Sequence, residues 1–240
     1  ILKEEDIEIF ELSGIAPNPK IESVREGVKL CKENDIDMVL AIGGGSVIDC
    51  AKVVAAGACY DGDPWDLVIT PRWIKKALPI YSVLTLSATG SEMDPFAVIS
   101  DMSKNEKWGT SSEHMKPKMS ILDPEYTYSV SKKQTAAGTA DMISHICENY
   151  FTNVKNADVQ ARFAEGLLKN CFKYGPIALE EPDNYDARAN LMWTASMAIN
   201  GILSDGAEVS WCVHPMEHEL SAFYDITHGE GLAILTPHWM

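Results

Sequence analysis

The sequence has no hydrophobic run long enough to cross a membrane. Its apolar segment Val53 to Cys59 lies within a helical pattern and is far shorter than the roughly 20 residues that a spanning helix needs. Basic residues are also scarce, since 20 Lys and Arg stand against 35 Asp and Glu, for a net charge of −15. An acidic surface repels phosphate groups, so we expect neither nucleic acid nor a membrane as a partner.

The sequence also lacks any CxxC pair. Its six cysteines are spread along the chain, mostly on apolar faces of predicted helices, which is typical of reduced, buried thiols in a cytoplasmic protein. The balance of 46% apolar and 23% charged residues excludes a disordered or fibrous chain. No initiator methionine precedes Ile1 and no stop signal follows Met240, so we expect a piece of a longer protein, truncated at both ends.

The first half of the chain alternates predicted strands with helices. Apolar runs of strand length occur at residues 7–12, 37–42, 79–84, 96–100 and 119–122. The run at 37–42 is almost wholly apolar, which is typical of a strand covered on both faces of a parallel sheet. Helical spacing follows Pro19, with Ile21, Val24, Val28 and Cys31 on one face, and resumes after Ser46. This alternation predicts a Rossmann-like α/β domain with a doubly wound parallel sheet.

After residue 130 the predicted strands cease. Residues 131–151, 158–172 and 186–202 all carry helical spacing. The fold class is therefore α/β plus all-α, with a cofactor-binding domain at 1–130 and a helical metal-binding domain at 131–240.

A glycine-rich turn follows the apolar run at 37–42. Gly43, Gly44, Gly45 and Ser46 separate this run from the next helix, so their backbone amides lie at a helix N-terminus, which favours a phosphate. A tight turn without a ligand, in which Ser46 caps the helix, is an equally weighted alternative. A second loop of small residues, 85–92, follows another predicted strand, and ligands of open α/β sheets bind at such strand ends.

Acid and histidine residues recur at helical spacing in the second half. Asp141 and His145 are four residues apart, as are His214 and His218, while His228 precedes a glycine. One carboxylate with several imidazoles is a donor set for Fe²⁺ or Zn²⁺.

Each of these residues also has a plainer interpretation. A buried histidine that bonds a carbonyl is more common than a metal ligand, and Asp141 would serve as a cap if its helix began near residues 138–141. Pro215 places His214 at a helix start or kink.

These segments resemble the iron-containing (group III) alcohol dehydrogenase family, in particular its butanol dehydrogenase branch. The matching motifs are GGGSVIDCAK (43–52), LTLSATGSEMD (84–94), LDP (122–124), QTAAGTADMISH (134–145), HPMEHELSA (214–222) and DITHGEGLAILTP (225–237). The resemblance implies a dehydroquinate synthase-like architecture with the active site between the two domains. It also implies four metal ligands: Asp141, His145, His214 and His228.

The resemblance further implies positions that meet the cofactor. Gly44, Gly45 and Ser46 would hold the pyrophosphate with support from Asp49, and the other positions are Asn18, Thr85, Ser87, Lys107 and Leu122. His218 would relay a proton beside the metal. The cofactor would be NAD or NADP and the metal Fe²⁺, with Zn²⁺ as the alternative.

The implied reaction is hydride transfer between NAD(P)H and a small aldehyde or primary alcohol such as butanal or butanol. Alternatives are a polyol dehydrogenase or a lyase on the same scaffold, or a non-catalytic metal-binding fragment. The segments 141–148 and 214–228 contain no Lys or Arg, which favours an uncharged alcohol. Compared with the family, the opening strand and several C-terminal helices are missing, so we expect weak cofactor binding and a partly exposed metal domain. Apolar helix faces are consistent with a homodimer or with an ordinary core.

Overall fold

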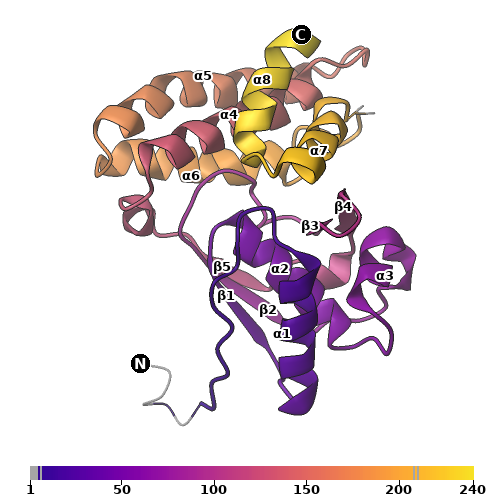
Figure 1. Ribbon diagram of the computed structural model, residues 1–240. Coiled ribbons are helices and arrows are strands. Elements are labelled where there is room, and N and C mark those ends of the chain that lie inside the picture. Colours follow the sequence, from indigo (N-terminus) through magenta and orange to yellow (C-terminus); the bar gives the residue numbers. More distant parts are fainter. Residues whose placement is uncertain (1–4, 6, 208, 210) are drawn as a thin grey trace.

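The structure, a computed structural model, describes residue 5, residues 7–207, residue 209 and residues 211–240. A unit with a small sheet lies below a unit built only of helices (Figure 1). The predicted strand at 7–12 is wrong. This segment is extended but pairs with no described strand, and Ile7 and Ile9 are exposed.

Three parallel strands form the sheet. They are β1 (Val39–Gly43), β2 (Ile80–Leu84) and β5 (Met119–Ile121), in the order β1-β2-β5. The helices α1 (Ile21–Glu33), α2 (Gly45–Gly57) and α3 (Pro64–Ile69) accompany them. The predicted apolar face of α1 is confirmed, since Ile21, Val24, Val28 and Cys31 are all buried. This arrangement confirms the parallel sheet with helices that the sequence predicts.

Only one face of the sheet is well covered by the described residues. Ala41 and Leu84 are buried in a cluster with Ile48 of α2. The opposite face carries exposed apolar side chains: Leu40, Ile42, Met119 and Ile121. Coverage of β1 on both faces, which its composition predicts, is therefore wrong for this chain.

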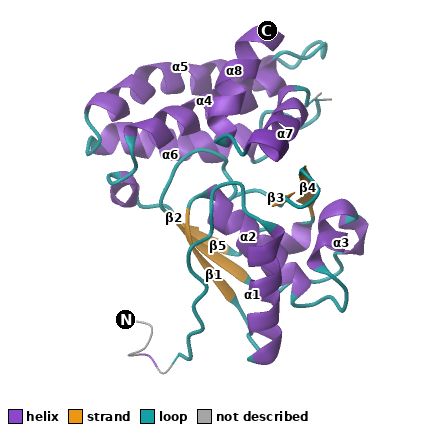
Figure 2. Ribbon diagram, in the orientation of Figure 1, coloured by secondary structure: helices purple, strands orange, loops and turns teal. Residues whose placement is uncertain are grey.

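An antiparallel hairpin stands apart from this sheet. It comprises β3 (Phe96–Asp101) and β4 (Glu106–Ser111), and it lies between the two units (Figure 2). The predicted strand at 96–100 is confirmed, but it belongs to this hairpin and not to the parallel sheet. The sequence reasoning missed β4, because the segment EKWGTS is polar and contains a glycine.

Five helices form the described part of the second unit. They are α4 (Lys132–Tyr150), α5 (Asp158–Glu180), α6 (Tyr185–Ile199), α7 (Val213–Tyr224) and α8 (His228–Trp239). Three of them confirm predicted helices, although α5 runs beyond the predicted end at residue 172. None of the helices described is long and apolar enough to span a bilayer. Strands end at Ile121 and long helices begin at Lys132, while the domain division at residue 130 stays a prediction.

Side chains from both units pack together in a shared core. Met192 of α6 joins the cluster that holds Ala41 and Leu84 of the sheet. The buried Ser196 hydroxyl of α6 donates to the Glu92 carboxylate. This shared core fixes the position of the helical unit over the carboxyl ends of β1 and β2.

Candidate functional site

The four predicted metal ligands lie near one another although the first and last are 87 positions apart in the sequence. Asp141 and His145 lie one turn apart inside α4, His214 lies in the first turn of α7, and His228 begins α8. Asp141 Oδ1 is 3.6 Å from His145 Nδ1, 3.7 Å from His214 Nε2 and 3.8 Å from His228 Nε2. Three histidine nitrogens thus lie 3.6–3.8 Å from one carboxylate oxygen. The donor atoms of Asp141, His214 and His228 also lie within 4.8 Å of one another, a group that does not include His145.

These distances fit a divalent metal ion. In a tetrahedral site with bonds of about 2.0–2.2 Å, the ligand atoms lie roughly 3.3–3.6 Å apart. Among the described residues, Asp141 Oδ1, His145 Nδ1 and His214 Nε2 are buried and have no hydrogen-bond partner. Buried polar atoms without partners are costly, so three such atoms facing one point indicate a ligand that binds there. The donor set of one carboxylate and three imidazoles suits Fe²⁺ or Zn²⁺.

The structure tests two of the plainer interpretations, and it rejects the first and confirms the second. Asp141 does not cap a helix, because α4 begins at Lys132 and the Ser131 side chain caps it. The position of His214 at a helix start, which Pro215 predicts, is confirmed.

Two buried carboxylates orient two of the histidines, and the sequence reasoning missed both. Glu148 contacts Nδ1 of His214, and Glu217 contacts Nδ1 of His228. Each contact leaves Nε2 of its imidazole facing Asp141. Spacing carried a signal for both acids, since Glu148 is seven residues after Asp141 and Glu217 is three after His214 on the same helices.

The proton affinities of these groups follow from their neighbours. Burial alone would raise the pKa of Asp141, but the surrounding histidines hold it well below its usual value. Burial lowers the pKa of His145 to about 4. Burial opposes protonation of His214 as well, yet the nearby Asp141 and Glu148 carboxylates raise its pKa to about 9. The pKa values of His145 and His214 shift in opposite directions because the Glu148 carboxylate contacts His214.

The glycine turn lines a crevice of about 270 Å³ that reaches the metal ligands. Gly44, Gly45 and Ser46 form one wall, and Asn18, Asp141 and His228 also line it. Gly44, not Ser46, is the N-cap of α2, so the interpretation of Ser46 as a helix cap is wrong. A Cβ on Gly45 would lie 2.3 Å from Thr89 Oγ1, which shows how closely the two loops approach.

A second cavity of about 280 Å³ adjoins this crevice, and Asn18, Gly45, Ser46, Thr89 and His228 line both. Its walls include Asp49, Lys107 and His218, together with the predicted metal ligands His145 and His214. Burial lowers the pKa of His218 well below its usual value, so this side chain is a neutral imidazole in the cavity. Trp211, which the sequence reasoning also missed, makes T-shaped ring contacts with His145 and His214.

Asp49 and Lys107 make contacts that the sequence did not predict. Asp49 accepts hydrogen bonds from Ser91 Oγ and Val98 N, and burial raises its pKa to about 6. Lys107 Nζ lies 3.1 Å from Glu217 Oε2 and 3.4 Å from Nδ1 of His228. A lysine thus lies beside the predicted metal ligand His228, although the segments 141–148 and 214–228 contain no Lys or Arg. This lysine comes from β4 and pairs with the Glu217 carboxylate.

The other predicted cofactor positions divide into two groups. Asn18 lines both cavities, with a left-handed backbone at φ 49°. Of the described residues, Thr85, Ser87 and Leu122 line neither cavity, and Leu122 packs against the cluster shared by the two units. Their contacts with a cofactor stay predictions.

Glu217, His218 and His228 also place donor atoms within 4.8 Å of one another. Here Glu217 already bonds His228 Nδ1 and the Lys107 ammonium, so these atoms have partners. The Asp141 cluster, whose buried donor atoms have no hydrogen-bond partner, is therefore the better candidate for a cation.

Comparison with known proteins agrees with this geometry. The chain is 62% identical to NADH-dependent butanol dehydrogenase A of Clostridium acetobutylicum, over all of this chain and 62% of that protein. It is 43% identical to the NADPH-dependent aldehyde reductase YqhD of Escherichia coli, over 96% of this chain and 60% of the relative. The chain thus spans about 60% of the length of these relatives.

A solved structure and two family models extend the comparison. The crystal structure of NADH-dependent butanol dehydrogenase A from Thermotoga maritima matches with a TM-score of 0.96 and 47% identity, over 99% of this chain and 60% of that one. The model of iron-containing alcohol dehydrogenases matches residues 1–124, and the C-terminal model of the Fe-containing alcohol dehydrogenase family matches residues 135–240. The chain therefore belongs to the iron-containing alcohol dehydrogenase family, as its motifs indicate.

Proposed function

We propose that the protein containing this chain transfers a hydride between NAD(P)H and a small aldehyde or primary alcohol such as butanal or butanol. The observation that carries this proposal is the position of the four ligand atoms where the glycine-rich crevice meets the second cavity. A metal held by Asp141, His145, His214 and His228 would, when bound, act as a Lewis acid on the substrate oxygen.

The chain's own residues would bind and orient the reactants. Gly44, Gly45 and Ser46 offer backbone amides at the start of α2, where a pyrophosphate is favoured. The crevice behind them leads to His228, so a nicotinamide bound along it would lie beside the ligands. Apolar side chains, including Phe96, Ile199 and Trp211, line the second cavity and would exclude water around a short alkyl chain.

His218 is our candidate for proton transfer. Its ring centroid lies 5.8 Å from that of His228, and it faces the same cavity. A neutral imidazole at this position can accept a proton from an alcohol oxygen, directly or through water, and burial makes it release that proton readily.

The finer assignments rest on the relatives and on the chain's chemistry. Relatives 61–62% identical are named NADH-dependent, so we propose NADH before NADPH, and Fe²⁺ before Zn²⁺ because of the family. Cys31, Cys50, Cys147 and Cys171 are buried thiols that form no disulfide, which supports a cytoplasmic location. The exposed apolar face of the sheet supports a homodimer.

Replacing single ligands tests this proposal. We expect His145→Ala and His228→Ala to lose bound metal and NADH oxidation with butanal together, in the full-length protein. His114→Ala is the matched control, because His114 is exposed and lies outside both cavities. Full activity in a variant that no longer binds metal would refute the proposal. Metal binding without cofactor binding by the present chain alone would favour the non-catalytic fragment.

A further inference from the structure

The metal site is connected to the other unit by one chain of buried contacts. All four predicted ligands lie in the helical unit, yet Lys107 comes from β4 of the hairpin. Glu217 bonds Nδ1 of His228 on one side and receives the Lys107 ammonium at 3.1 Å on the other. The side chains of Glu217 and Lys107 are 0% and 4% exposed, so water does not screen this pair.

The corresponding pair at His214 is held differently. Glu148 accepts hydrogen bonds from the backbone amides of Cys212, Val213 and His214, which all belong to the helical unit. Glu217 instead has the Ser221 hydroxyl from its own helix and Lys107 from the hairpin. The orientation of His228 therefore depends on the other unit, whereas that of His214 does not.

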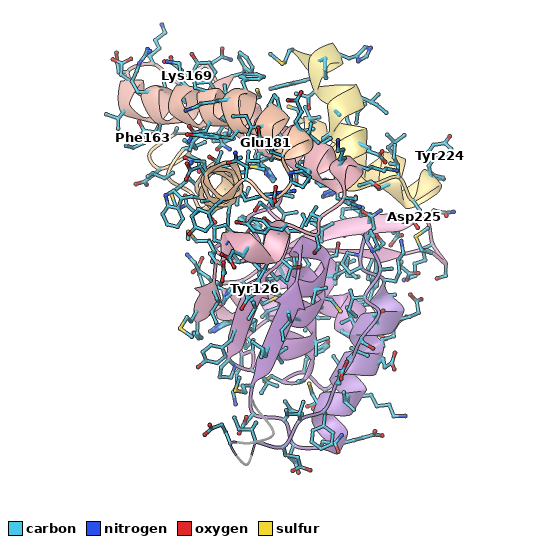
Figure 3. All side chains as sticks on the ribbon, turned by 90° about the vertical axis from the view of Figure 1, so that its left-hand side faces the viewer. Tyr126, Phe163, Lys169, Glu181, Tyr224 and Asp225 are labelled. Carbon is cyan, nitrogen blue, oxygen red and sulfur yellow. The ribbon has the colours of Figure 1, made fainter. Side chains whose placement is uncertain are left out.

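Further contacts hold the hairpin side against the turn between α7 and α8. Asn18 accepts a hydrogen bond from Lys107 and donates to Asp225 Oδ1 and to the Ile226 carbonyl. Lys20 Nζ lies 2.6 Å from the same Asp225 oxygen. Figure 3 shows Asp225 at the lower edge of the helical unit, next to the hairpin. These contacts keep Lys107 close to Glu217.

We propose that Glu217 is a positioning residue for the metal ligand His228, that Lys107 holds Glu217 in place, and that the hairpin thereby sets metal affinity without supplying a ligand. This inference rests on the proposed metal site. A carboxylate that accepts the Nδ1 proton fixes the tautomer of the imidazole and leaves Nε2 free to bind a metal. His228 Nε2 does face Asp141.

Lys107 would act on a bound cation in two opposed ways. Its charge repels the cation, while its bond to Glu217 keeps the carboxylate on His228. The repulsion acts on the cation directly, whereas the positioning effect exists only with Glu217. A double-mutant cycle separates the two effects.

The test measures Co²⁺ dissociation constants by chelator competition for the native chain, Glu217→Ala, Lys107→Met and the double variant. We expect Glu217→Ala to weaken Co²⁺ binding about 10- to 100-fold. Lys107→Met should increase Co²⁺ affinity more in the Glu217→Ala background than in the native background, and the two effects should differ by about threefold or more. The Co²⁺ visible absorption should change with Glu217→Ala, because the ligand geometry changes.

Three controls complete the design. Lys104→Met removes an exposed lysine from the same hairpin and should leave Co²⁺ affinity unchanged. Glu148→Ala should weaken binding, but without coupling to Lys107→Met. Glu217→Gln preserves the shape of the side chain if Glu217→Ala fails to fold, and it should still weaken binding.

Native Co²⁺ affinity in a folded Glu217 variant, or equal effects of Lys107→Met in both backgrounds, would overturn the inference. Failure of the proposed function is a separate result. In that case the Co²⁺ affinities of the four variants show the expected coupling between Glu217 and Lys107, but the full-length protein does not oxidise NADH with butanal.

Discussion

Replacement of Gly229 by alanine should damage both the fold and the metal site. Gly229 follows His228 in the first turn of α8 and packs against α4, which carries Asp141 and His145. A Cβ at this position would lie 2.0 Å from the backbone oxygen of Ala137. Backbone cannot rotate away as a side chain can, so the two helices would have to separate.

The size of this effect follows from the distances. Ordinary contact begins near 3.4 Å, so α8 would have to move by about 1.4 Å (3.4 − 2.0) relative to α4. Metal–ligand bonds tolerate deviations of only about 0.2 Å, so His228 would leave the coordination distance from an ion held by Asp141. Overpacking of this kind costs about 3 kcal/mol, which corresponds to a loss of roughly 6–12 °C in Tm for a chain of this size.

The assay is thermal unfolding of Gly229→Ala with and without added Co²⁺. We expect a lower Tm without metal and little or no stabilisation by Co²⁺. The matched control is Gly166→Ala in α5, where no described atom outside the local helix lies within 4 Å of the added Cβ. This control should raise stability by up to about 1 kcal/mol through helix propensity. A Gly229→Ala variant with native Tm and native Co²⁺ affinity would refute the reasoning.

Three further predictions concern buried and half-buried polar side chains. The pKa of Asp49 is raised to about 6, so its contribution to the free energy of unfolding is present below about pH 4 and is lost as the pH rises through 6. Asp49→Asn should remove up to about 3 kcal/mol of this pH dependence, measured by urea unfolding. Lys52 is fully buried, and its Nζ lies 2.8 Å from Asp94 Oδ1, so Lys52→Met should lower the free energy of unfolding by about 3–5 kcal/mol at pH 7. This loss should be smaller at pH 5, where the carboxylates gain protons, and an equal loss at both pH values would contradict the prediction. Ser196→Ala should cost about 1–3 kcal/mol in urea unfolding, because it removes the hydroxyl that donates to the buried Glu92, and an unchanged urea midpoint would count against it.

The sequence determined what depends on spacing within one element. The i,i+4 spacing of Asp141 and His145 places both on one face of a helix, and Pro215 restricts His214 to a helix start, because these are local properties of the backbone. The glycine turn likewise follows directly from a strand–turn–helix pattern. The motifs at these positions were sufficient to place the chain in its family.

Only the tertiary structure decided which distant groups face one another. Glu217 and Lys107 are 110 residues apart, and no local spacing predicts that an exposed-looking polar segment such as β4 would bring its lysine to a helix of the other unit. The uncovered face of the sheet could not be predicted for the same reason. The composition of β1 is that of a buried strand, but composition does not show which segments of this chain pack against it. Side-chain direction is a local property, but burial and pairing are properties of the packed whole.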